Sequence, residues 1–198
     1  MLKSKIVGIT LILVSIIIPI YKNYQTKQNQ TLNKKEVQIY LNETANNKKD
    51  SEYTITVKKV PTTKYIAVLS IPEINLKRGL VEPTSTQNSV KYNIEIIKGS
   101  SLPDKVSTNL VLAAHSGNSK VSFFKDLDKL KISSLIELYY NGFKYTYELS
   151  SINTVNKSGE VKVTRTRDKN TITLITCKKD SDTEQVIYLG YLKAQIPY

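Results

Sequence analysis

One cysteine and one histidine are the side chains of this chain best suited to nucleophilic chemistry. Cys177 closes the run Thr-Ile-Thr-Leu-Ile-Thr-Cys, and His115 closes a second apolar run that begins at Asn109. A thiol reacts as its thiolate, which needs a neighbouring group to take or hold its proton. His115 is the one imidazole in the chain, and a single cysteine allows no intramolecular disulfide. The pair predicts thiol-based catalysis; the alternative is a small buried cysteine and an unrelated core histidine.

Both residues end segments of β-strand character. Alternate residues of a strand face opposite sides, so Cys177 should share a side with Thr173 and Ile175. A cysteine at a strand end lies at the rim of a sheet or barrel, where a substrate can reach it. His115 ends its run in the same way, just before the flexible connection Ser116–Asn118.

The elements that must position this pair are short, apolar and rich in β-branched and aromatic residues. Gly, Pro and Asn punctuate them, and the pair Asn141-Gly142 is typical of a two-residue hairpin turn. We therefore predict an all-β domain over residues 64–198, an eight-stranded closed or nearly closed β-barrel with short helical turns. The eight segments are Tyr65–Ile71, Leu76–Leu80, Ile94–Ile97, Asn109–Ala114, Leu135–Tyr140, Phe143–Thr154, Thr171–Thr176 and Val186–Leu192.

The N-terminus, residues 1–24, has the composition of a membrane anchor. Ile6 through Ile20 carry no charge, and Lys3 and Lys5 precede them. No small-residue cleavage site and no lipoprotein cysteine follow this run. We expect an uncleaved single-pass transmembrane helix over residues 6–20, in the plasma membrane, with the remaining chain on the extracellular face.

Residues 25–63 are polar and rich in Lys, Asn, Gln and Thr, which predicts an extracellular linker. A short helix is expected around Asn33–Glu43, and Tyr53–Val57 alternates like a strand or an extended segment. The formal net charge is +12, but the lysines are scattered and form no basic helix or Arg-rich cluster. We therefore predict no nucleic-acid partner, while attraction to anionic wall polymers or lipid headgroups stays open.

The segments that end in Cys177 and His115 resemble those of the sortase family. Thr173–Cys177 is Thr-Leu-Ile-Thr-Cys, which matches the sortase active-site pattern TLxTC at every specified position. Leu112–His115 resembles the segment that carries the sortase histidine, although glycine is more usual at Ala114. The segments Gly99–Pro103 and Asn141–Tyr147 also match, and the resemblance covers Tyr65 to Leu192.

The resemblance implies a membrane-tethered cysteine transpeptidase, of a class A-like or class D-like housekeeping type. Such an enzyme cleaves a C-terminal sorting signal of secreted proteins, by default Leu-Pro-x-Thr-Gly-like. It then joins the new carboxyl end to a cell-wall precursor or pilin amine. Carried over, Cys177 is the nucleophile, His115 the general acid and base, and Thr176 part of the active-site pattern. No cofactor and no metal are implied. Glu73, Glu82 and Glu95 are expected to be ordinary surface carboxylates rather than a calcium site.

One position departs from the family. Sortases usually carry an arginine on the strand after the cysteine, to orient substrate and stabilise the oxyanion, and Gln185 occupies the matching position here. Three alternatives remain: Gln185 acts as a neutral amide donor, another cation substitutes, or the enzyme is weak or inactive. The cations that could substitute are Arg165, Arg167, Lys178 and Lys179.

Other classes of function also remain open at this stage. A degenerate barrel could bind secreted peptides without turnover, and a hydrolase could release the cleaved peptide to water. A plain membrane-tethered β-domain would leave Cys177 unreactive.

Overall fold

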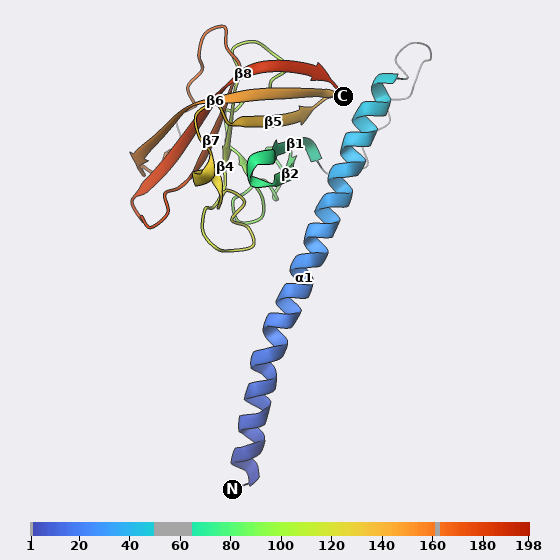
Figure 1. Cartoon of the computed structure of the whole chain (residues 1–198), viewed down its shortest axis with the longest axis vertical. Helices are drawn as coiled ribbons and strands as arrows, with labels where there is room; N and C mark the ends of the chain where they lie inside the picture. The colour runs from blue at the N-terminus through green and yellow to red at the C-terminus, as the bar shows by residue number, and fades with distance from the viewer. Residues whose placement is uncertain (1, 50–64, 161–162) are drawn as a thin grey trace. The chain divides into compact units, whose positions relative to one another are not determined.

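The computed structural model describes residues 2–49, 65–160 and 163–198 of the chain (Figure 1). It divides into two units, Met1–Lys35 and Glu36–Tyr198. The first is helical and belongs to helix α1 (Leu2–Lys49). The second holds the end of that helix and an eight-stranded sheet that curls into a nearly closed barrel.

All eight predicted strands are present. Their bounds are β1 (Tyr65–Ile71), β2 (Leu76–Val81), β3 (Glu95–Ile96), β4 (Asn109–Ala113), β5 (Leu135–Tyr140), β6 (Phe143–Asn156), β7 (Thr171–Cys177) and β8 (Glu184–Pro197). Two short 3₁₀ helices accompany them, η2 (Pro72–Ile74) and η3 (Leu127–Lys129), which agrees with the predicted short helical turns. The predicted fold class of the domain is confirmed.

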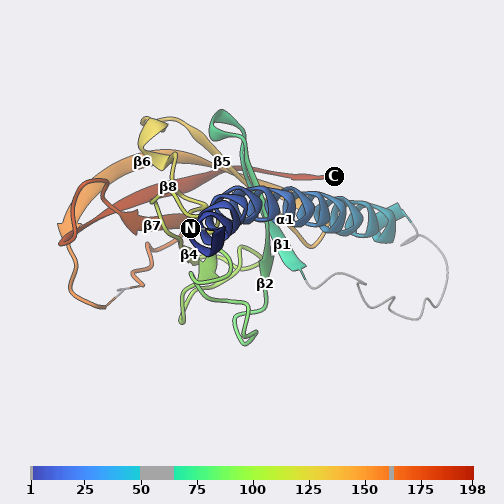
Figure 2. The same cartoon turned by 90° about the horizontal axis from the view of Figure 1, so that it is seen from below.

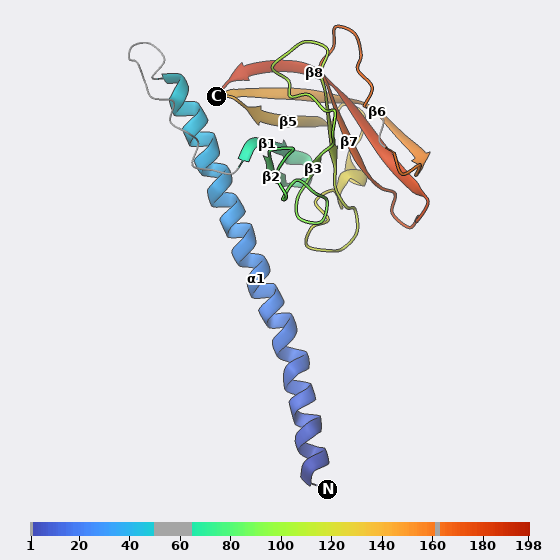
Figure 3. The ribbon, with the colours of Figure 1, turned by 180° about the vertical axis from the view of Figure 1, so that it is seen from behind.

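The strands follow the order β2-β1-β5-β6-β8-β7-β4-β3 around the barrel. Figure 2 shows part of this order, in which β6, β8, β7 and β4 follow one another. Long strands β6 and β8 pair along almost their whole length and form a ribbon beside β7 (Figure 3). The pair of β4 and β7 is parallel, whereas the other strand pairs of the described chain are antiparallel. The parallel pair brings together two segments that lie far apart in the sequence.

The predicted hairpin turn forms as the residue types require. Tyr140 and Phe143 are the last register partners of β5 and β6, with Asn141 and Gly142 between them. Both turn residues have positive φ, 48° and 74°. A two-residue turn with positive φ at both positions matches the right-handed twist of the strands, and Asn-Gly adopts it with little strain.

The barrel interior is filled by apolar side chains from alternate strand positions. On β7, Ile172 and Leu174 are fully buried in this core, as are Leu110 and Leu112 on β4. Residues between them must face the other side of the sheet. Because Leu174 points inward, Cys177 lies on the outer side with Thr173 and Ile175, which agrees with the predicted alternation.

Helix α1 is longer than the short helix that the sequence predicts within the polar linker. The short helix expected at Asn33–Glu43 is part of it, and the helix continues to Lys49. Its last turns gain tertiary contacts: Val37 and Tyr40 are buried against β1 and β2, and the Tyr40 hydroxyl donates to the carbonyl of Ile66 at 2.6 Å. Packing of one helix face onto a sheet stabilises a segment whose own apolar stripe is weak.

In the part of the chain that the structure describes, no helix contains a stretch that is both long and apolar enough to cross a membrane. The predicted anchor over residues 6–20 therefore stays a prediction. The extended segment predicted at Tyr53–Val57 lies outside the described residues.

Candidate active site

The parallel pairing of β4 and β7 determines where the two candidate catalytic residues lie. Its register runs from Asn109 opposite Thr171 to Ala113 opposite Ile175. Cys177 lies two positions further along β7, and His115 lies two residues beyond the end of β4. Register partners of a parallel pair face the same side, so both residues come from neighbouring strand ends on the outer face of the barrel.

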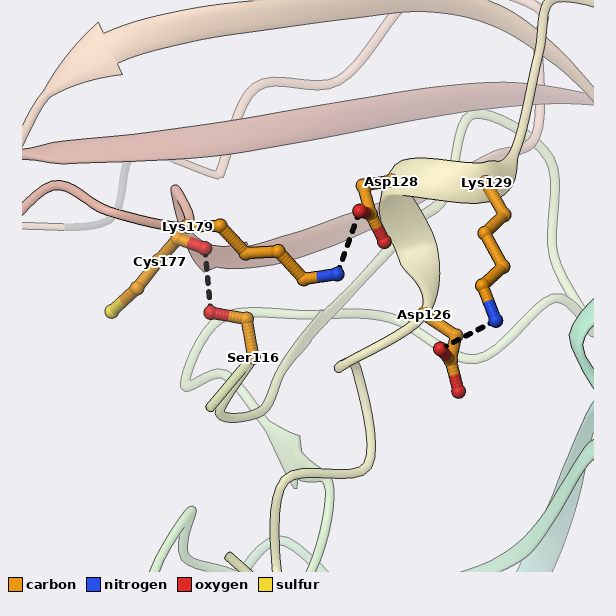
Figure 4. A network of polar contacts seen from close by, with 6 residues as sticks. All are labelled: Ser116, Asp126, Asp128, Lys129, Cys177 and Lys179. Carbon is orange, nitrogen blue, oxygen red and sulfur yellow. Dashed lines mark hydrogen bonds and ion pairs between the residues drawn. The ribbon is translucent and has the colours of Figure 1, made fainter. Parts of the chain in front are cut away.

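Hydrogen bonds hold these two strand ends together. The N–H of Ala114 donates to the carbonyl of Ile175 at 3.2 Å, and the Thr176 hydroxyl donates to the carbonyl of Ala114 at 2.8 Å. The Ser116 hydroxyl donates to the carbonyl of Cys177 at 2.7 Å (Figure 4). Residues on both sides of His115 are therefore bonded to the strand that ends in Cys177.

Cys177 is partly exposed and opens into a pocket of about 600 Å³. The pocket lies between the segment that follows His115 and the β7–β8 connection, and Lys157 lines it from the end of β6. His115 itself is exposed to solvent. Access to the thiol, predicted from its place at a strand end, is confirmed.

Gln185 lies next to Cys177. The two residues are Cα partners in the antiparallel pair of β7 and β8, and Gln185 is partly buried. Directly opposite residues of an antiparallel pair face the same side, with Cβ atoms roughly 4.5–5.5 Å apart. Three adjacent strands, β4, β7 and β8, thus contribute His115, Cys177 and Gln185 in this order.

The candidate substitute cations have other partners. The Arg165 guanidinium donates from one nitrogen to the carbonyl of Gly99 at 2.9 Å and to the Ser101 hydroxyl at 2.8 Å. Arg165 therefore ties the β6–β7 connection to the segment before β4. Arg167 is exposed. Neither arginine lines the pocket at Cys177, and neither do His115 and Gln185.

Both lysines of the β7–β8 connection line that pocket, and each is paired with a carboxylate. The ammonium of Lys178 lies 2.8 Å from a carboxylate oxygen of Glu184. The ammonium of Lys179 lies 2.6 Å from a carboxylate oxygen of Asp128, which belongs to η3 (Figure 4). Paired ammonium groups are less available to a developing oxyanion than an amide with free N–H groups would be.

The outer face of β7 is covered by the connection that precedes it. Thr173 donates to the side-chain oxygen of Asn109 at 3.0 Å, and the Asn109 amide donates to the carbonyl of Thr164 at 2.7 Å. Thr173 and Ile175 are buried although they point away from the core. The β6–β7 connection thus forms a wall beside the strand that leads to the thiol.

Sequence reasoning missed Ser116. It was assigned to a flexible connection, whereas its side chain is 8% exposed and bonded to the backbone of Cys177. A serine after a histidine carries no distinctive local pattern, because serine is common in turns. The contact of this hydroxyl with Cys177 could be predicted only once the pairing of the two strand ends is known.

The site combines a partly exposed thiol and an imidazole from adjacent strand ends, and an amide side chain lies opposite the thiol. These groups define a class of protein, the thiol-dependent enzymes. The arrangement suits acyl transfer through a thioester, in which the thiolate attacks a carbonyl and the imidazole carries the proton. An amide side chain carries N–H groups of the kind that stabilise the oxyanion formed in such a reaction.

Comparison with known proteins identifies the family. A family model described as the sortase domain matches residues 69–193, so the chain belongs to the sortase family. The protein is therefore a sortase-type cysteine transpeptidase, and the resemblance seen in the sequence is confirmed.

Individual relatives agree with this assignment. Sortase A from Bacillus anthracis is 26% identical over 179 residues, which cover 84% of this chain and 81% of that protein. The crystal structure of sortase C1 from Streptococcus agalactiae is 26% identical with a TM-score of 0.60, and the match covers 81% of this chain and 89% of the other. Sortase A from Listeria monocytogenes shares the fold at 20% identity and a TM-score of 0.58, over 68% and 91% of the two chains.

Proposed function

We propose that this sortase cleaves a C-terminal sorting signal of secreted proteins and transfers the new carboxyl end to an amine, with Cys177 as nucleophile and His115 as general acid and base. The observation that carries the proposal is the juxtaposition of the two residues at neighbouring ends of the parallel strands β4 and β7. They are the single cysteine and the single histidine of the chain.

The proposed reaction has two steps. The Cys177 thiolate attacks the scissile carbonyl, the C–N bond breaks, and the His115 imidazolium gives a proton to the leaving amine. The acyl group is then held as a thioester on Cys177. An acceptor amine attacks this thioester, His115 takes its proton, and the thiolate leaves. One peptide bond is exchanged for another, so no nucleotide is needed.

Gln185 supplies a neutral N–H to the oxyanion in both steps. Its support is its register position opposite Cys177, together with the other partners of Arg165, Lys178 and Lys179. An amide brings no charge, so stabilisation of the oxyanion rests on its hydrogen bond and on local backbone N–H groups. A weak enzyme or a peptide-binding barrel is the alternative if this donor does not suffice.

The substrate is proposed to carry a Leu-Pro-x-Thr-Gly-like signal, and the acceptor to be a cell-wall precursor amine or a pilin lysine. The family supplies both expectations. The sorting-signal peptide would bind at the pocket beside Cys177, between the segment that follows His115 and the β7–β8 connection.

Residues 6–20 are proposed to anchor the protein in the plasma membrane as a single-pass helix, with residues 64–198 outside the cell. The charge-free run Ile6–Ile20 and the preceding Lys3 and Lys5 support this placement. An extracellular active site also suits a reaction that conserves bond energy in a thioester.

Mass spectrometry of trapped acyl-enzyme tests the proposal. The full chain in detergent is incubated with a panel of sorting-signal peptides, with and without an amine such as triglycine. We expect a mass increase on Cys177 for the preferred peptide and a ligated product only when the amine is present. Cleavage that is the same with and without the amine would favour the hydrolase, and binding without any adduct would favour the degenerate barrel.

A further inference from the structure

We propose that Ser116 is a positioning residue of the active site, whose hydroxyl fixes the end of β4 to the backbone of Cys177 and so sets the placement of His115 relative to the thiol. The proposal rests on the roles proposed above for His115 and Cys177. Its physical basis is the way the hydrogen-bond ladder between β4 and β7 ends.

In a parallel ladder, the N–H groups of every second residue donate to carbonyls two residues apart on the neighbouring strand. The last backbone bond of this kind joins the N–H of Ala114 to the carbonyl of Ile175. The next one would join the N–H of Ser116 to the carbonyl of Cys177. The Ser116 hydroxyl donates to that carbonyl instead, at 2.7 Å. The side chain continues the ladder for one more step after the backbone has left it.

The carbonyl of Cys177 faces β4 and not β8, because the hydrogen-bonded residue pair at this end of β7 and β8 is the next one, Lys178 with Glu184. The N–H of Lys178 donates to the carbonyl of Glu184 at 3.1 Å. Hydrogen-bonded and non-hydrogen-bonded pairs alternate along an antiparallel ladder, so Cys177 and Gln185 do not exchange backbone bonds. Ser116 is therefore the group that meets this carbonyl on the β4 side.

His115 is held on both sides by these contacts. Before it, Ala114 is bonded through its N–H to Ile175 and through its carbonyl to the Thr176 hydroxyl. The carbonyl of His115 accepts from the N–H of Phe124 at 3.0 Å. After it, the hydrogen bond of the Ser116 hydroxyl is the only one of these contacts that reaches Cys177 itself. Without that hydroxyl, the chain beyond His115 is tied to its own loop but not to Cys177.

Ser116 is 8% exposed, so water cannot readily replace the lost hydroxyl in a Ser116→Ala variant. The expected result is a change in geometry rather than in substrate contacts. A displacement of about 1 Å between reacting groups can lower a rate by about 10²-fold. We therefore expect kcat to fall at least about fivefold in Ser116→Ala, and KM to stay within about twofold of wild type.

The control is a hydroxyl of the same kind at the other end of the same strand pair. Thr171 is buried, and its hydroxyl donates to the carbonyl of Thr108 at 3.1 Å. Thr171→Val removes this bond without changing the shape of the side chain. It should lower the melting temperature about as much as Ser116→Ala while leaving kcat unchanged. Ser116→Thr keeps a hydroxyl at the active-site end and should restore kcat to within about threefold of wild type.

The experiment measures kcat and KM of the three variants on one sorting-signal peptide, and the rate at which iodoacetamide alkylates Cys177 as a function of pH without substrate. The proposal expects an altered alkylation profile for Ser116→Ala alone. Equal kcat and equal alkylation profiles in Ser116→Ala and Thr171→Val would overturn it, as would a folded Ser116→Thr variant as impaired as Ser116→Ala.

The alkylation profile also separates this proposal from the proposed function. If Cys177→Ala retained turnover, the proposed function would fail. An altered profile in Ser116→Ala would then still show that Ser116 positions the thiol and imidazole. An unaltered profile would reject the positioning role whatever the enzyme does.

Discussion

Cys177 and Gln185 form a non-hydrogen-bonded pair across β7 and β8, the arrangement in which opposite side chains of an antiparallel sheet lie closest. An amide therefore flanks the thiol at the position where sortases usually carry an arginine. The nearest basic residues of the β7–β8 connection are neutralised by Glu184 and Asp128.

Gln185→Ala is expected to lower kcat by about 10²–10³-fold with little change in KM, because one oxyanion donor is lost. Arg165→Ala is the matched control, since the Arg165 guanidinium is engaged by Gly99 and Ser101, and it should leave kcat near wild type. Steady-state kinetics on one peptide decide the matter. Near-wild-type kcat in Gln185→Ala would assign the oxyanion to backbone N–H groups, and a severe loss in Arg165→Ala would restore the cation alternative.

Cys177→Ala is expected to abolish cleavage and acyl-enzyme formation while leaving the melting temperature close to that of wild type. The substitution removes the sulfur of a partly exposed side chain at a strand end, so little buried volume is lost. Peptide cleavage and thermal denaturation are measured on the same sample. Turnover by a folded variant would reject Cys177 as the nucleophile.

His115→Ala is expected to lower kcat by about 10²–10⁴-fold, the usual effect of removing a general acid or base. No second imidazole exists in the chain to replace it. The side chain is exposed, so the fold should be unaffected, and circular dichroism checks this. If kcat/KM matched wild type, His115 would have no part in proton transfer.

Tyr147→Phe is expected to stabilise the barrel. Tyr147 is fully buried, and among the described residues its hydroxyl oxygen has no hydrogen-bond partner. An unsatisfied buried hydroxyl costs about 1–3 kcal/mol, and phenylalanine keeps the ring while removing that cost. Thermal denaturation should show a melting temperature a few degrees higher, by about 2–4 °C per kcal/mol for a domain of this size. A lower melting temperature would show that the hydroxyl is satisfied in solution.

The same variant should change the stability of the protein at alkaline pH. Burial, followed by the neighbouring Tyr145, raises the pKa of Tyr147 above its ordinary value of 10.0. The unfolded chain then loses this proton at lower pH than the folded one, so the free energy of unfolding falls as the pH rises above about 10. Denaturant titrations should show a shallower alkaline decline in Tyr147→Phe. An identical slope in the two proteins would exclude the contribution of Tyr147.

Membrane topology is tested by thiol labelling of intact cells. A membrane-impermeant maleimide should label Cys177 without lysis if residues 6–20 form the anchor and the barrel is outside. The protein carries one thiol, so the Cys177→Ala variant is an exact negative control for the label. Labelling only after lysis would place the barrel inside, and labelling only after denaturation would show that the thiol is inaccessible.

The sequence by itself determined the local features of the domain. Period-two alternation and turn residues located eight strands, placed Cys177 on the same side of its strand as Thr173 and Ile175, and predicted the Asn141-Gly142 turn. These features depend on residues within a few positions of one another, because side-chain alternation and turn geometry are properties of the local backbone. The TLxTC match added the family, and with it the expectation that Cys177 and His115 act together.

Only the tertiary structure decided which of these elements meet. The parallel pairing of β4 with β7, the register that sets Gln185 opposite Cys177, and the contact of Arg165 with Gly99 join residues far apart in the chain. It also decided that the Ser116 hydroxyl, in a segment that reads as an ordinary loop, meets the backbone of Cys177. Strand pairing depends on the shared core and on the hydrogen-bond ladder of the whole barrel. Neither can be predicted from the residues of a single strand.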